Sequence, residues 1–255
     1  SRGNRLLTFA RKPAPVQVTA WGYATGTGLD AMDAFLADPV VVPPEEEHRY
    51  AERIVHLPAV ICFEPPAGLP AITPLPALER GHITFGAFNR LPKITPETRA
   101  AWAAVMRAVP TAHLLIKTGP QDSPAAVQQL ADDLVALGVD RQRIALRHPT
   151  PRLEHLAAHR DIDVMLDSFP HTGGVTTVES LMMGVPVITF PGEGVAARLS
   201  ASFLSALGLS ELIAASPEQF VALAQAVSGR LPWLAEQRAT LRARLFSSPI
   251  GDSLA

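Results

Sequence analysis

A short segment with two glycines and two threonines has the residue types needed to bind phosphate. Residues 173–177 read Gly-Gly-Val-Thr-Thr; they follow the apolar run 163–167 and precede a helix-like segment. Glycines let the backbone approach a ligand closely and adopt positive φ. A helix N-terminus adds free N–H groups and the positive end of its dipole, which together can bind a phosphate. On spacing alone, a tight turn with an N-cap explains the segment equally well, and Glu179 would then close a capping box with Thr176.

A lysine and a histidine follow two other strand candidates. Lys93 follows the candidate strand 83–88, and His155 follows the candidate strand 144–146. A lysine in a strand-to-helix loop can reach a diphosphate as a point charge, and an imidazole can stack on a flat base. Taken alone, each residue is more often an ordinary surface residue. Because ligands bind at the carboxyl ends of parallel strands, the three segments together favour a ligand site more than any one of them does.

The elements that must position these residues alternate between strands and helices. The helix after residue 95 has a capping threonine, a proline at its first position and an apolar stripe at i, i+3, i+4 and i+7, formed by Trp102, Val105, Met106 and Val109. Ser216 and Gln219 indicate a capping box at the start of another helix. This alternation predicts an α/β fold with a doubly wound parallel sheet. The strands are expected at 83–88, 113–116, 144–146, 164–166 and 186–190, and the helices from 95, from 124 to 138, at 151–159, after 177 and from 216.

The chain divides into three regions by composition. Residues 1–64 hold short apolar runs separated by turns, and residues 65–80 are rich in proline, which favours an extended, semi-rigid linker. Residues 81–255 carry the strand–helix alternation. We therefore expect part of one domain before the linker and a second domain after it.

Composition excludes several classes of protein. The net charge of −2 provides no global basic field for nucleic acid. The single cysteine, Cys62, allows no internal disulfide and no cysteine-based metal site, which is consistent with a reducing cytoplasm. No apolar run approaches the roughly 20 residues of a membrane span, and no signal peptide is evident. The chain begins at Ser1 without a methionine, so we expect it to be part of a longer protein.

Several segments resemble one family of enzymes. Residues 85–102 (FGAFNRLPKITPETRAAW), 144–167, 173–189 (GGVTTVESLMMGVPVIT) and 191–214 (PGEGVAARLSASFLSALGLSELIA) resemble the catalytic region of O-GlcNAc transferases. They look most like bacterial members, which often carry tetratricopeptide repeats. Residues 5–38 are similar to the end of the family's N-terminal catalytic lobe. The resemblance implies the GT-B fold, in which two Rossmann-like lobes enclose a UDP-sugar.

The resemblance also implies roles for individual residues. Lys93 matches the lysine that neutralises the leaving diphosphate. Val175 stands where the animal enzymes have histidine, Arg90 where they have glutamine and Ala24 where proline is usual. The implied diphosphate site is Gly173, Gly174, Thr176 and Thr177; the implied uracil and ribose site is Thr150, Arg152, His155 and Glu179; and the implied sugar pocket is Trp21, Gly22, Ala24 and Val175.

The resemblance implies an inverting transfer of a sugar, with N-acetylglucosamine expected, from a UDP-sugar to a Ser or Thr hydroxyl of an acceptor protein or peptide. Positive charge and N–H donors placed where charge develops would stabilise the leaving UDP, so no metal or other cofactor is expected. The family's candidate general-base region lies upstream of the part that residues 1–5 resemble, so we expect this chain to be the donor-binding half and inactive alone. Two alternatives remain open: a UDP-sugar 2-epimerase, which needs acid and base carboxylates in the cleft, and a non-catalytic nucleotide-sugar or peptide-binding module.

Overall fold

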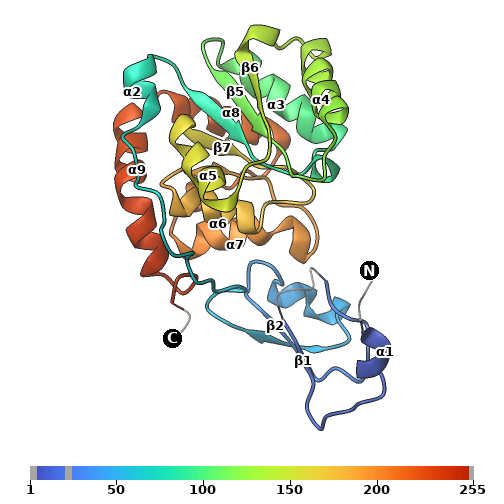
Figure 1. Cartoon of the computed structure of the whole chain (residues 1–255). Coiled ribbons are helices and arrows are strands. Elements are labelled where there is room, and N and C mark those ends of the chain that lie inside the picture. The colour runs from blue at the N-terminus through green and yellow to red at the C-terminus, as the bar shows by residue number, and fades with distance from the viewer. Residues whose placement is uncertain (1–4, 21–24, 253–255) are drawn as a thin grey trace.

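The computed structural model describes residues 5–20 and 25–252. Figure 1 shows a larger body built around one sheet and a smaller body, at the lower right, built around a second sheet. The chain passes from the smaller body to the larger one along a segment that precedes α2 (Pro76–Arg80).

The larger sheet has five parallel strands in the order β6-β5-β4-β7-β8. The chain runs outward from β4 through β5 to β6 and then returns to β7 and β8 on the other side of β4. The strand order therefore reverses between β4 and β7, which is where doubly wound sheets form a ligand crevice. This arrangement confirms the predicted α/β fold. The strands are β4 (Thr84–Ala87), β5 (His113–Lys117), β6 (Ile144–Arg147), β7 (Val164–Leu166) and β8 (Val187–Ile188).

Helices cover both faces of this sheet (Figure 1). On one side α3 packs against α4 and α8, and on the other α6 packs against α7 and α9. The helices are α3 (Pro96–Ala108), α4 (Pro124–Ala136), α5 (Arg152–Ala157), α6 (Val175–Met182), α7 (Leu199–Ala206), α8 (Pro217–Ser228) and α9 (Leu231–Phe246). Short 3-10 segments are η2 (Leu91–Lys93), η3 (Arg141–Arg143), η4 (Ala158–Asp161), η5 (Val195–Ala197) and η6 (Ser210–Leu212).

Two of the predicted helix starts form as expected, with one difference. The Thr95 hydroxyl accepts a bond from the Thr98 N–H at 3.2 Å, and the Ser216 hydroxyl accepts one from the Gln219 N–H at 3.1 Å. The return bond of the second capping box goes to the preceding residue, because the Gln219 side chain accepts from the Ala215 N–H at 2.6 Å. Local sequence signals therefore place both helix starts correctly.

The smaller sheet has three parallel strands in the order β1-β2-β3. They are β1 (Val18–Thr19), β2 (Ala34–Ala37) and β3 (Arg53–His56), accompanied by α1 (Leu6–Phe9) and η1 (Pro44–Arg49). The division of the chain at residues 64 and 80 stays a prediction.

The predicted linker is not extended throughout, because its end forms α2. Pro76 occupies the first helical position, where its missing N–H has no intrahelical partner to lose. The Ala77 N–H donates to the Asp163 carboxylate at 2.8 Å, and Gly81, at φ 72°, ends the helix in the left-handed conformation. The prediction of an extended segment over all of 65–80 was therefore wrong for its last turn.

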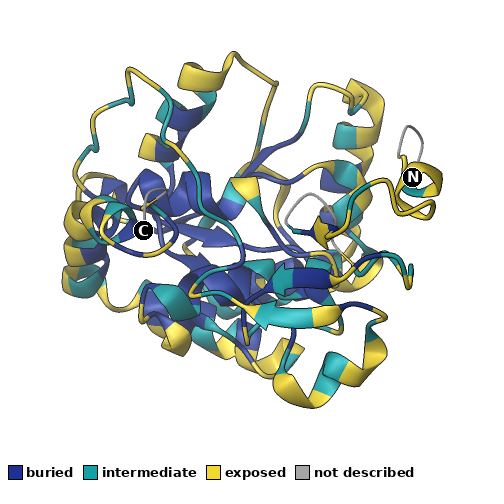
Figure 2. Ribbon diagram, turned by 90° about the horizontal axis from the view of Figure 1, so that it is seen from below, coloured by how far each residue is buried: buried dark blue, intermediate teal, exposed yellow. Residues whose placement is uncertain are grey.

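Buried side chains connect the core to the carboxyl edge of the larger sheet. Figure 2 shows the strands in dark blue at the centre, with the exposed residues on the outer faces of the helices. Trp102 of α3 is fully buried, and its indole N–H donates to the carbonyl of Asp167 at 3.0 Å, just beyond β7. This bond fixes the end of β7 against α3. Within the described residues, no helix is long and apolar enough to cross a membrane.

Candidate functional site

The reversal of strand order between β4 and β7 brings Lys93 to the glycine segment. Lys93 ends η2, which follows β4, and Thr172 lies in the loop that follows β7. The Lys93 ammonium donates to the Thr172 carbonyl at 2.7 Å. Burial lowers the pKa of Lys93, while the nearby Asp167 carboxylate acts in the opposite direction. The predicted lysine and the predicted turn are therefore neighbours at the point where the strand order reverses.

Close packing, rather than unusual backbone angles, requires the first glycine of the turn. A Cβ on Gly173 would lie 2.1 Å from the Thr177 hydroxyl oxygen. Neither Gly173 nor Gly174 has a positive φ, and Gly174 has φ −122°. The expectation of positive φ was wrong, whereas the expected close approach of the backbone to a ligand stays a prediction.

The two threonines lie inside the first turn of α6, which begins at Val175 after Gly174 at the N-cap. No side chain caps this helix, so the predicted capping box between Thr176 and Glu179 does not form. Thr177 is buried, and its hydroxyl bonds to the Ser200 hydroxyl at 2.7 Å. The first N–H groups of a helix have no intrahelical acceptor, so those of α6 remain the natural donors to an anion here.

A buried carboxylate that the sequence did not single out shapes this turn. Asp167 follows β7 and accepts bonds from the Gly173 N–H, the Ser168 N–H and the Thr189 hydroxyl, each at 2.8 Å. Burial raises its pKa. Its only sequence signal was its place at the end of the apolar run 163–167.

The four residues predicted to contact uracil and ribose lie together. They line a pocket of about 330 Å³ at the ends of β5 and β6, beside α5 and α6. Its lining is Thr118, Gly119, Pro120, Pro149, Thr150, Arg152, His155 and Glu179. The geometry groups the predicted residues, while their individual roles stay predictions.

Glu179 orders two of these side chains. Its carboxylate, 6% exposed, lies 2.9 Å from an Arg152 guanidinium nitrogen and 3.4 Å from His155 Nε2. Because one carboxylate contacts both groups, α6 fixes the direction in which the two side chains of α5 point. The acidic residue therefore has a clear orienting function in this structure, in place of the helix cap considered for it above.

A second histidine, His159, packs against the ring of His155. His159 is fully buried; its Nδ1 lies 3.0 Å from the Leu156 carbonyl, and its ring is edge-on to His155 at 5.7 Å between centroids. The Phe88 ring packs 4.8 Å from His159 and 5.7 Å from His155. Burial lowers the pKa of His159 to about 3, so this ring is neutral at physiological pH.

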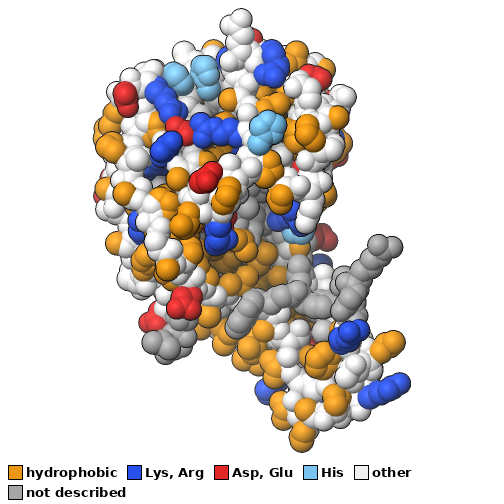
Figure 3. Space-filling view, viewed as in Figure 1, with side chains coloured by type: hydrophobic (Ala, Val, Ile, Leu, Met, Phe, Trp, Pro, Cys, Tyr) orange, Lys and Arg blue, Asp and Glu red, His pale blue; other side chains and the backbone are white. Residues whose placement is uncertain are grey.

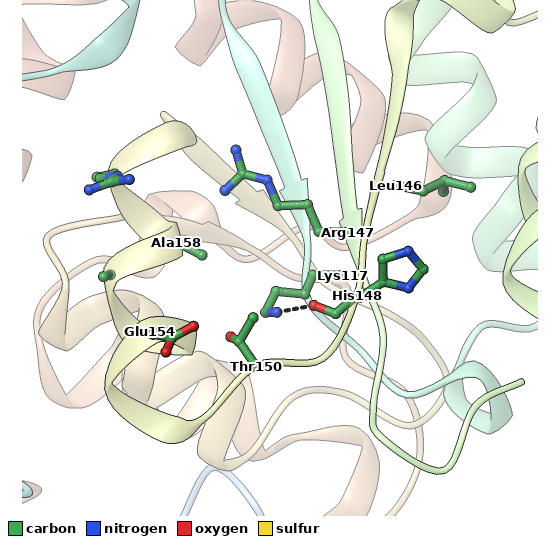
Figure 4. A pocket seen from close by; sticks show the side chains of 9 residues that line it. Lys117, Leu146, Arg147, His148, Thr150, Glu154 and Ala158 are labelled. Atoms are coloured by element: carbon green, nitrogen blue, oxygen red, sulfur yellow. Dashed lines mark hydrogen bonds between the residues drawn. The ribbon is translucent and has the colours of Figure 1, made fainter. Parts of the chain in front are cut away.

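A second hollow lies on the other side of Thr150. It has a volume of about 460 Å³ and includes Lys117, Arg147, His148 and Glu154 in its lining. The Lys117 side chain is buried, burial lowers its pKa, and its ammonium donates to the His148 carbonyl (Figure 4). Lys117 thereby anchors the loop that carries Thr150. Figure 3 shows Lys and Arg side chains gathered over α5 and the end of β6, with acidic side chains among them.

Asp161 and Asp163 have the Asp-x-Asp spacing that can bind a cation, but both carboxylates form contacts with other groups of the protein. Asp161 accepts from Arg80 at 2.8 Å and from Arg147 at 2.7 Å. Asp163 accepts from the Ala77 and Thr84 N–H groups, each at 2.8 Å, beside the start of β7. Over residues 5–20 and 25–252, no group of three or more His, Cys, Asp or Glu residues could hold a metal ion.

The predicted sugar pocket is described only in part. Val175 is 65% exposed at the first position of α6, next to the glycine turn. Trp21, Gly22 and Ala24 lie outside the described residues.

The doubly wound parallel sheet, with the reversal of strand order between β4 and β7, has the fold of a lobe of the GT-B type. The solved structure of a mutant O-GlcNAc transferase from Thermobaculum terrenum is similar, with 39% sequence identity and a TM-score of 0.88, over 97% of this chain and 47% of that one. A mutant of Staphylococcus aureus TarM, with 11% identity and a TM-score of 0.56, shares the fold.

The chain belongs to Glycosyl transferase family 41, whose model matches residues 1–63 and 75–253. It is 37% identical over 252 residues to the rice "Probable UDP-N-acetylglucosamine--peptide N-acetylglucosaminyltransferase SPINDLY". It is 29% identical over 265 residues to the Arabidopsis thaliana "Probable UDP-N-acetylglucosamine--peptide N-acetylglucosaminyltransferase SEC". The chain spans 27% of the length of each of these relatives.

Proposed function

We propose that this chain binds the donor of an inverting glycosyltransferase that moves N-acetylglucosamine from UDP to a Ser or Thr hydroxyl of a protein or peptide in the cytoplasm. Residues 81–255 would form the donor lobe, and residues 1–64 would belong to the opposite lobe. The observation that carries the proposal is the position of Lys93, whose ammonium lies 2.7 Å from the carbonyl of Thr172 across the switch-point crevice.

This position suits the departure of a nucleoside diphosphate. An ammonium has three donors, and Lys93 uses one of them on Thr172. The other two can meet the phosphate oxygens on which charge builds as the glycosidic bond breaks. In the proposal, N–H groups at the start of α6, just after Gly174, would donate to the same oxygens, so charge stabilisation would be in place before the reaction begins.

The pocket beside Thr150 supports the identity of the base. Pro120 and Pro149 line it, and Glu179 orients His155 and Arg152 within it. In the proposal, the His155 ring stacks on uracil, the backbone at Thr150 meets the edge of the base, and Arg152 and Glu179 contact the ribose. In the proposal, the backbone contact at Thr150 distinguishes uracil from other bases.

Calorimetry with the 255-residue chain tests the donor assignment. We expect UDP to bind more tightly than ADP or GDP, and His155→Ala to weaken UDP binding. His148→Ala, which changes an exposed histidine in the adjacent loop, is the matched control. Equal affinity for the three nucleotides would remove the uridine assignment. Turnover of UDP-N-acetylglucosamine by the full-length protein then separates a transferase from a non-catalytic binding module.

A further inference from the structure

Two contacts join the start of α7 to the smaller sheet. The Arg198 guanidinium donates to both carboxylate oxygens of Glu46 in η1, at 2.9 and 2.7 Å. Four residues along α7, the Ser202 hydroxyl donates to the buried Asp38 carboxylate just beyond β2. Residues four apart share a helix face, so one face of α7 contacts the smaller sheet at two points.

The same short segment also holds the glycine turn of the larger sheet. The Thr172 N–H donates to the Ala196 carbonyl at 3.1 Å, and the Ser200 hydroxyl donates to the Gly173 carbonyl at 3.1 Å. Arg198 lies between these two residues, and its Nε donates to the Gly192 carbonyl at 3.0 Å. The guanidinium of Arg198 therefore binds Glu46, while its backbone belongs to the segment that forms hydrogen bonds with Thr172 and Gly173.

The geometry of the Glu46–Arg198 ion pair is better suited to fixing the relative position of η1 and the start of α7 than to holding them together. The Glu46 and Arg198 side chains are only 17% and 14% exposed, so both charges are largely removed from water. Desolvation offsets much of the attraction in such a pair, and apolar residues can hold two surfaces together at least as well. A bidentate Arg–carboxylate pair instead fixes both the distance and the angle between its partners.

We infer that Arg198, held by Glu46, is a positioning residue for the diphosphate turn. Through residues 192–200, the pair fixes the position of the backbone at Thr172 and Gly173. It thereby also fixes the position of the Thr172 carbonyl that accepts a hydrogen bond from Lys93. The smaller body would in this way influence donor binding without touching the diphosphate. The inference rests on the proposed function for its link to UDP, although the link to the turn itself is independent of it.

The test uses Glu46→Gln in the 255-residue chain with two measurements. One is UDP affinity by calorimetry, and the other is the amide resonances of Gly173 and Gly174 in glycine-labelled protein. We expect UDP affinity to fall about tenfold, within the usual range of coupling between sites, and the two glycine resonances to move. Arg198→Lys, which keeps the charge but loses the bidentate geometry, should give a smaller change of the same kind.

A matched control is available in the same sheet. Asp33 pairs with Lys12 at 2.6 Å and its side chain is 42% exposed, so Asp33→Asn removes a carboxylate outside the Glu46–Arg198 pair and should leave both readouts unchanged. If Glu46 and Arg198 act as a pair, Glu46→Gln combined with Arg198→Gln should change UDP affinity no more than the worse single variant.

The outcomes separate this inference from the proposed function. Glycine resonances that move no more in Glu46→Gln than in Asp33→Asn would overturn the inference, whatever the affinities. If the unmodified chain does not bind UDP, the proposed function fails, and the glycine resonances still decide whether the ion pair positions the turn. Movement of the resonances together with the affinity loss supports both.

Discussion

The Lys93 ammonium and the Thr172 carbonyl meet at 2.7 Å at the point where the strand order reverses. Burial lowers the pKa of Lys93 and raises that of Asp167, the carboxyl group that acts on it. Desolvation therefore disfavours the charged form of each group, and for Lys93 the attraction of Asp167 opposes this effect. An incoming diphosphate would supply negative charge where the protein already holds a desolvated cation, which is the arrangement that electrostatic catalysis requires.

We expect Lys93→Ala in the full-length protein to lower turnover far more than it weakens UDP-sugar binding. Charge accumulates on the diphosphate as the bond breaks, so the ammonium acts most strongly in the transition state. The loss of one such contact typically costs about 100- to 1000-fold in rate. Steady-state kinetics and calorimetry provide the two measurements. Lys12→Ala, at an exposed ion pair, is the control; near-normal turnover in Lys93→Ala would reject the assignment.

Gly173→Ala should damage both folding and UDP binding. The added Cβ would lie 2.1 Å from the Thr177 hydroxyl, and such overpacking typically costs about 1–3 kcal/mol. In the proposed site, a shift of Thr177 would disturb the helix start that faces the diphosphate. Chemical denaturation and calorimetry with UDP measure the two effects. Gly229→Ala is the matched control, because its Cβ would meet only the Ala226 carbonyl, at 3.7 Å; equal behaviour of the two variants would contradict the packing argument.

Local patterns were sufficient to predict most of the larger sheet. Apolar runs and helix caps act within a few residues, so β4 to β7 and the starts of α3, α4 and α8 fall where the sequence places them. Strand β8 is shorter than expected, since only Val187 and Ile188 pair in the ladder, while Thr189 forms an isolated bridge with Ile213.

Contacts between distant residues were beyond the reach of those patterns. The Glu46–Arg198 pair joins residues separated by 152 positions, and Asp167 meets Gly173 only because a loop folds back onto the end of β7. Glu179 shows the same limit, because local spacing favoured a helix cap whereas its partners come from α5. The candidate site could be predicted in its residues but not in the contacts that orient them.

Glu179→Gln should weaken UDP binding by about tenfold, because hydrogen bonds to charged groups contribute about 1.5–3 kcal/mol. The carboxylate orients both Arg152 and His155, and an amide cannot accept from both in the same way. Calorimetry with the 255-residue chain gives the measurement. Glu154→Gln changes an exposed carboxylate on the same helix as Arg152 and should have little effect. Similar losses in the two variants would indicate a general effect of charge instead.

His159 should make the chain less stable in mild acid. Its pKa falls from 6.5 to about 3 on folding, chiefly through burial and also through the charges of His155 and Arg238. A depressed folded pKa means that the unfolded chain takes up the proton first. The stability that His159 contributes is therefore complete above pH 6.5 and is lost as pH falls toward 3. The loss is about 1.4 kcal/mol per pH unit in this window.

Urea unfolding followed by tryptophan fluorescence, from about pH 7.5 to about pH 5, should show the stability advantage of the unmodified chain over His159→Gln shrinking as pH falls. His148→Gln alters an imidazole that is exposed in the folded protein and should leave the pH dependence unchanged. An advantage that stays constant across this range would show that His159 is not buried as a neutral ring.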